Sequence, residues 1–168
     1  MFWPAYFILA YLAVGIQLGV APVLRVGGAS PNFVLMCVVF IAVNAPREAA
    51  LLGCFALGAM QDLVTQDTLG LYALSYGLFA LMAGGSGQAV YRGHPLTHFA
   101  LTLGGGLLLA IVLLVHSWLP YKDAVHLSVG TMLWSAVYSA IWAPFIIWPL
   151  HRMNRSFGFH PARRRSRV

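Results

Sequence analysis

Asp62 is the only carboxylate that this sequence places inside an apolar run. It lies in the stretch 47–76, where Ala50, Cys54, Gly58 and Asp62 follow one another at i+4 spacing and therefore share one face of a helix. Small residues on a membrane helix let a neighbouring backbone come close. A charge on the same face is predicted to point into a helix bundle, because facing lipid would cost at least about 2.5–3.5 kcal/mol. Asp62 is therefore the first candidate for a functional residue.

The position of Asp62 leaves two interpretations open. The carboxylate lies about one turn from the predicted end of its helix, where the macrodipole disfavours a negative charge, so we expect a compensating partner. In the first interpretation it reaches interfacial water or accepts hydrogen bonds from Thr65, Thr68 or Tyr72. In the second it is a structural lock or a contact for another protein.

Patterns that would indicate an enzyme or a metal site are incomplete. The stretch Gly84-Gly85-Ser86-Gly87-Gln88 lacks the final glycine of the serine-hydrolase pattern G-x-S-x-G. His94 and His98 have metal-ligand spacing, but Pro95 lies between them and no third ligand is near in sequence. With four acidic residues in the whole chain, general acid–base chemistry has few candidates. We therefore expect no catalytic activity, no cofactor and no metal ion.

The composition is that of a membrane protein. Of 168 residues 60% are hydrophobic and 8% charged, against about 25% charged in a soluble domain. Six crossings of about 20 residues each would use most of this length. We predict an all-α, polytopic integral membrane bundle formed by residues 1–150 as a single domain, followed by a basic cytoplasmic tail, 151–168. Because six of the ten Lys and Arg residues lie in that tail, beside a membrane helix, we expect it to contact anionic lipid and not nucleic acid.

Six apolar segments are predicted, at about 5–24, 31–45, 47–64, 69–91, 97–119 and 124–150. Ser30 is a plausible N-cap for the second segment, and Pro31 suits its first helical position. Asp67 or Thr68 is expected to cap the fourth segment. The second segment is short for a full crossing, so either the bilayer thins locally or this segment pairs with the third and is protected by other helices.

Several patterns predict how these helices pack. A homodimer contact is one interpretation of Gly15-x-x-x-Gly19. In the fourth segment, one face is expected to pack on the third segment, and it consists of Tyr76, Ala80, Gly84 and Gln88. The fifth segment has a thin point for close packing or bending at Gly104, Gly105 and Gly106. The sixth has a polar stripe, Thr131, Ser135 and Ser139, and Pro144 and Pro149 should kink its last turns.

The distribution of basic residues predicts the orientation. With six crossings, Arg47, Arg92 and the tail arginines lie on one side, and only Arg25 and Lys122 lie on the other. The positive-inside rule then places the N- and C-termini in the cytoplasm and Asp62 near the outer end of its helix. A model with five crossings splits these charges less cleanly.

In these features the sequence resembles a known family, that of the bacterial rod-shape-determining membrane protein MreD. The resemblance covers the whole chain in length and hydropathy. The motif lies within residues 31–76 and consists of Pro31-Asn32, Gly53, Gly58, Asp62, Leu69-Gly70-Leu71 and Ala73-Leu74-Ser75-Tyr76. The family commonly has Asp after the proline, where this chain has Asn32.

The resemblance implies a non-catalytic scaffold in the bacterial inner membrane that acts in cell elongation and lateral peptidoglycan synthesis. It implies MreC as direct partner and, through MreC, the MreB filaments and the peptidoglycan glycosyltransferase and transpeptidase. Asp62 would fix the outer end of the bundle, and a lipid-facing groove would receive the partner's helix. The candidate structural or partner-binding residues are Pro31, Asn32, Gly53, Gly58, Asp62, Gly70 and Tyr76.

A second function class also fits the size and helix count. MreD-like chains are similar in length, in number of helices and in expected fold to the substrate-binding subunits of energy-coupling-factor vitamin transporters. In such a protein Asn32, Asp62, Tyr72, Trp118 and Tyr121 would line a pocket for a small molecule at the outer side. A vitamin retained through purification would favour this alternative.

Overall fold

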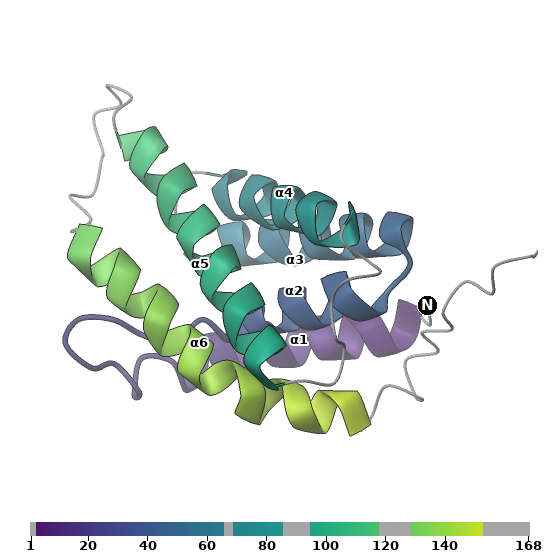
Figure 1. Cartoon of the computed structure of the whole chain (residues 1–168), viewed down its shortest axis with the longest axis horizontal. Helices are drawn as coiled ribbons and strands as arrows, with labels where there is room; N and C mark the ends of the chain where they lie inside the picture. The colour runs from purple at the N-terminus through teal and green to yellow at the C-terminus, as the bar shows by residue number, and fades with distance from the viewer. Residues whose placement is uncertain (1–2, 66–68, 86–94, 118–128, 153–168) are drawn as a thin grey trace, which may run out of the picture.

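The computed structural model describes residues 3–65, 69–85, 95–117 and 129–152. Within these ranges the chain forms six α-helices and no strand, which confirms the all-α prediction (Figure 1). The helices are α1 Trp3–Gly19, α2 Phe33–Asn44, α3 Arg47–Thr65, α4 Leu71–Gly85, α5 Pro95–Ser117 and α6 Val129–Arg152.

Consecutive helices run in opposite directions, so the chain passes back and forth through the bundle (Figure 1). Helices α1 to α4 lie side by side, and α5 and α6 pack on each other and run obliquely to that group (Figure 1). Because α2 contacts each of the other five helices, it forms the axis of the bundle.

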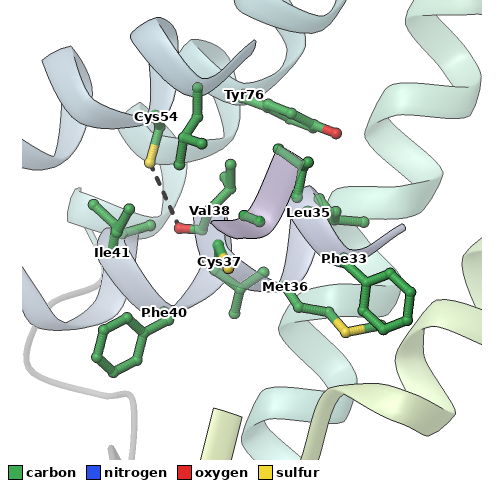
Figure 2. Packing of buried hydrophobic residues seen from close by; sticks show 14 of the residues in the cluster. Phe33, Leu35, Met36, Cys37, Val38, Phe40, Ile41, Cys54 and Tyr76 are labelled. Carbon is green, nitrogen blue, oxygen red and sulfur yellow. Dashed lines mark hydrogen bonds between the residues drawn. The ribbon is translucent and has the colours of Figure 1, made fainter. Parts of the chain in front are cut away.

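Helix α2 is short and buried along its whole length. Its 12 residues span about 18 Å, and each of them is buried. A helix that is apolar on every side belongs in an interior, and the sequence from Phe33 to Val43 has no polar position. Figure 2 shows its side chains, among them Leu35, Met36 and Phe40, pointing in different directions into the surrounding helices. Of the two expectations for this segment, protection by other helices is the one that the structure supports.

The start of α2 differs from the prediction. Asn32, not Ser30, is the N-cap, and its side-chain oxygen accepts the backbone N–H of Leu35 at 2.9 Å. Pro31 therefore precedes the cap and does not occupy the first helical position. Ser30 lies two residues too early to reach that N–H, and its carbonyl instead accepts the hydroxyl of Ser135 at 2.8 Å.

The first helix is shorter than predicted. It ends at Gly19, and Val20 to Leu24 form turns in which the carbonyl of Val20 accepts the N–H groups of Val23 and Leu24. Pro22 explains the end of the helix, because proline has no N–H to donate and disfavours helical geometry in the residue before it.

The outer surface fits a membrane. In the described ranges three helices are long and apolar enough to cross one, namely Arg47–Thr65, Leu96–Ser117 and Val129–Leu150. Shorter apolar helices cover Pro4–Gly19, Phe33–Asn44 and Leu71–Ala83. Large apolar side chains are exposed on the outside of the bundle, including Tyr11, Leu63 and Phe145. Because its helices are apolar and their outer side chains are exposed, the chain is a helical membrane protein.

Glycines on α5 produce the close packing that their sequence predicts. A Cβ at Gly106 would lie 2.8 Å from the Cβ of Ala136 on α6, and one at Gly105 would lie 3.0 Å from Leu35 on α2. Gly104 faces open space, as do Gly15 and Gly19 on α1. The contact of α5 with α2 and α6 therefore depends on two of the three glycines, while the predicted dimer contact through α1 stays a prediction.

The prolines of α6 lie inside the helix, at positions 144 and 149. The ribbon of α6 changes direction towards its C-terminal end (Figure 1), as expected where proline interrupts the hydrogen-bond ladder. Helix α6 continues to Arg152, and residues 153–168 of the predicted tail lie outside the described residues.

We predict that Gly106→Leu destabilises the protein while Gly104→Leu does not. A side chain at position 106 would force α5 away from Ala136, and overpacking of this kind costs about 1–3 kcal/mol. Thermal unfolding in detergent, followed by fluorescence, measures the difference. Equal melting temperatures for the two variants would contradict the close contact of α5 with α6.

Candidate functional site

The predicted small-residue face of α3 is buried against α4. Ala50 and Cys54 are fully buried and Asp62 is 1% exposed, so the prediction that this face points into the bundle is confirmed. A Cβ at Gly58 would lie only 2.5 Å from the Cα of Ala73. Glycine at position 58 therefore allows the backbones of α3 and α4 to meet one turn before Asp62.

Asp62 uses both carboxylate oxygens to bind the start of α4. Oδ2 accepts the backbone N–H groups of Gly70 at 3.1 Å and Ala73 at 3.0 Å, and Oδ1 accepts that of Tyr72 at 3.0 Å. The first N–H groups of a helix have no partner within the helix. Asp62 supplies that partner from another helix, in the way that an N-cap side chain does locally.

This geometry agrees in part with each of the two interpretations of Asp62. The carboxylate does accept a hydrogen bond from Tyr72, although the donor is its backbone and not its side chain. Thr65 is not a partner, since its hydroxyl donates to the carbonyl of Gln61 at 2.9 Å. Thr68, like the proposed cap Asp67, lies outside the described residues. Asp62 therefore joins α3 to the start of α4 through three hydrogen bonds, which we call the lock, and its contact with another protein stays a prediction.

The electrostatics of the junction also favour this placement. The charge of Asp62 lies near the C-terminus of α3, where the macrodipole opposes it, and at the N-terminus of α4, where the macrodipole attracts it. Three N–H donors add directly to that attraction. Gly70 permits the turn, because its φ of 101° lies in the left-handed region that other residues rarely adopt.

A second set of hydrogen bonds lies beside the lock. The Nδ2 group of Asn32 donates to the hydroxyl of Tyr76 at 3.0 Å, and that hydroxyl donates to Oε1 of Gln61 at 2.8 Å. These residues belong to the start of α2, to α4 and to α3. Since Gln61 precedes Asp62 in the chain, the two sets of bonds fix the same turn of α3.

Helices α1 and α6 complete the cluster around the start of α2. The backbone N–H of Asn32 donates to Oγ of Ser139 at 2.9 Å, and that of Phe33 donates to Oε1 of Gln17 at 2.7 Å. The Nε2 group of Gln17 in turn donates to the carbonyl of Pro31 at 3.4 Å. The backbone groups that precede α2 therefore have partners on both sides.

The structure brings most of the predicted site residues together. Asn32, Gly58, Asp62, Gly70 and Tyr76 all take part in the junction of α2, α3 and α4. Pro31 lies next to it, where its carbonyl accepts Nε2 of Gln17 on α1. Gly53 lies apart from them, because its carbonyl accepts the hydroxyl of Tyr6 at 2.6 Å where α1 meets α3. Cys54 also points towards α2, with its Sγ 3.5 Å from the carbonyl of Val38 (Figure 2).

Sequence reasoning missed Gln17 and Gln61. Each is an amide in a helix that is otherwise largely apolar, and such residues in a membrane helix usually face a partner inside the protein. That signal was present for both. The expected polar stripe of α6 is confirmed for Ser135 and Ser139, whose hydroxyl groups bind Ser30 and Asn32.

The polar side chains of this cluster bind one another or the backbone. In the described part of the chain no three His, Cys, Asp or Glu residues are grouped as metal ligands. His94, Trp118 and Tyr121, the sequence candidates for a metal site or a pocket, lie outside the described residues.

We predict that Asp62→Asn lowers the free energy of unfolding by about 1.5–3 kcal/mol, the value of a hydrogen bond to a charged group. The amide keeps the size of the side chain but replaces one acceptor oxygen with a donor. Glu48→Gln is the matched control, because Glu48 is an exposed acid at the other end of α3. Thermal unfolding of the two variants in detergent checks the prediction, and an Asp62→Asn protein as stable as wild type would refute the lock.

We also predict that Tyr76→Phe is more destabilising than Asn32→Asp. The first change leaves both Nδ2 of Asn32 and Oε1 of Gln61 without their partner, at a cost of about 1–3 kcal/mol. In the second, the Tyr76 hydroxyl can donate to the new carboxylate, and the Gln61 amide can rotate to donate in return. Melting temperatures in detergent decide the order, and the reverse order would contradict this hydrogen-bond network.

Comparison with known proteins identifies the family. The family model described as rod shape-determining protein MreD matches residues 1–154. No curated protein and no solved structure gives a match. The matched range covers the whole bundle, with the lock at Asp62 and the cluster at the start of α2. The chain therefore belongs to the MreD family of rod shape-determining proteins.

Proposed function

We propose that this protein is a non-catalytic scaffold of the bacterial cell-elongation machinery, which binds MreC and supports lateral peptidoglycan synthesis. A role in determining rod shape follows from membership of the MreD family. Through MreC the scaffold would be linked to MreB filaments and to the peptidoglycan glycosyltransferase and transpeptidase. The membrane helix of MreC would bind the lipid-facing surface of the bundle.

The observation that supports a scaffold best is the bonding of Asp62. It is the only carboxylate that the sequence places inside an apolar run, and both of its oxygens accept backbone N–H groups at the start of α4. A general acid or base needs an oxygen that can reach a substrate. In this protein the carboxylate stabilises a helix junction instead, as expected of a rigid platform for other proteins.

We further propose that the protein lies in the inner membrane with both termini in the cytoplasm. Arg47 at the start of α3 and Arg152 at the end of α6 lie at one end of the bundle, since consecutive helices alternate in direction (Figure 1). Arg25 follows α1 at the opposite end. The sequence adds Arg92 and the tail arginines to the first side, which the positive-inside rule assigns to the cytoplasm. Residues 1–150 would form the membrane domain and 151–168 a basic tail.

Affinity purification of the tagged protein in mild detergent tests this function. Mass spectrometry of the proteins and small molecules that accompany it is expected to find MreC and elongation enzymes, with no stoichiometric small molecule. Recovery of a stoichiometric vitamin together with ATPase subunits, and no MreC, would contradict the scaffold and indicate a transporter.

We predict that Asp62→Ala reduces both the recovery of MreC and the restoration of rod shape in cells that lack their own MreD. Loss of the lock separates α3 from α4 and so disturbs the surface offered to the partner. Glu48→Gln, which removes an exposed acid from the same helix, is expected to behave as wild type. If Asp62→Ala leaves stability, MreC recovery and cell shape unchanged, the assigned role of Asp62 is wrong.

A further inference from the structure

The connection between α1 and α2, residues 20–32, lies along the first half of α6 instead of standing above the bundle. The hydroxyl of Tyr138 donates to the carbonyl of Leu24 at 3.1 Å, and that of Ser135 donates to the carbonyl of Ser30 at 2.8 Å. Ser139 accepts the N–H of Asn32 at 2.9 Å. Three hydroxyl groups within two turns of α6 therefore bind the backbone of this connection.

The connection is folded into a tight turn that packs on α6. Val26 and Ala29 exchange two backbone hydrogen bonds, of 2.9 and 3.1 Å. Between them Gly27 and Gly28 have φ values of 60° and 85°, which suit a two-residue turn with both central residues in the left-handed region. A Cβ at Gly28 would lie 3.6 Å from Cγ2 of Thr131, in ordinary contact. The turn therefore packs against α6.

The contacts of the connection on α6 run from Thr131, the third residue of that helix, to Ser139. Ser139 is the eleventh of the 24 residues of α6, or about 15 Å from the start of that helix. On α5, Gly106 lies opposite Ala136. Because the two helices are antiparallel, the α5 residues after Gly106 lie beside the first turns of α6. Those residues, Leu107–Val115, are all apolar, so the apolar layer extends beyond the level of the connection.

One side of the connection packs on α6, and its other side is exposed. Two of its carbonyl groups, those of Leu24 and Ser30, accept hydroxyl groups of α6, while Val23 is 82% exposed and Val26 55% exposed. Backbone outside a helix is tolerated in a membrane where its polar groups are bonded to the protein. Arg25 is exposed beside these valines, and its long apolar stem allows the guanidinium to reach the phosphate groups while the backbone lies deeper.

From this geometry we propose that residues 20–32 are an acyl-chain-embedded connection that completes the membrane crossing begun by the short helix α2, with Val23 and Val26 in contact with lipid. The partner of this surface is the lipid bilayer itself. The proposal does not depend on MreC binding, and the two are tested separately.

The test uses Val23→Cys labelled with an environment-sensitive nitrobenzoxadiazole fluorophore, in nanodiscs of phosphatidylethanolamine and phosphatidylglycerol. Leu63→Cys is the lipid-facing reference, since Leu63 is 70% exposed on the apolar surface of α3. Glu48→Cys, at the exposed start of the same helix, is the aqueous reference. The unaltered chain, whose Cys37 and Cys54 are buried, gives the labelling background.

We expect the label at position 23 to emit close to the wavelength of the label at position 63. Lipids that carry a nitroxide on the upper acyl chain should quench it strongly, and iodide in the water should quench it several-fold less than the label at position 48. Emission and iodide quenching like those at position 48 would overturn the proposal, by placing the connection in water. Protection from both quenchers would also overturn it, because a protein surface would then cover Val23.

Discussion

A backbone N–H group without a hydrogen-bond acceptor is costly where water is excluded. At the start of α4, a single carboxylate on another helix is the acceptor for three such groups. Asp62 binds the N–H groups of Gly70, Tyr72 and Ala73, and it lies where the macrodipole of α4 attracts a negative charge. The N–H groups stabilise the buried negative charge, and the carboxylate in turn provides their acceptors. These hydrogen bonds fix the register of α3 against α4, and in that register Gly58 lies against the backbone of Ala73.

The rest of the bundle is built outward from this turn of α3. Gln61, next to Asp62, accepts the hydroxyl of Tyr76, which in turn accepts the amide of Asn32 at the start of α2. Helix α2 can be short because its start is bonded from several sides and its apolar surface is enclosed by the other five helices. The connection that precedes it then lies against α6. A shape-determining protein of this size thus uses its few polar residues to order its own helices.

The sequence predicted the helices and the buried face of Asp62 well, because hydrophobic length and i+4 spacing are local properties. Of the donors to Asp62 it named Tyr72 but not Gly70 or Ala73, since backbone groups carry no sequence signature and come from eight or more residues away. The choice of Asn32 over Ser30 as N-cap also depends on where the chain enters the bundle. Gln17 and Gln61 were visible as isolated amides, but only the three-dimensional arrangement shows that both support the start of α2.

Hydrogen exchange at the start of α4 tests the central claim most directly. In nanodiscs, mass spectrometry of peptides that cover residues 69–76 reports on the amides that Asp62 binds. If the carboxylate protects them, these amides exchange faster in Asp62→Asn than in wild type, while Glu48→Gln leaves them unchanged. Exchange at the wild-type rate in Asp62→Asn would show that α4 begins without help from α3, and would contradict the role of Asp62 as the residue that orders the bundle.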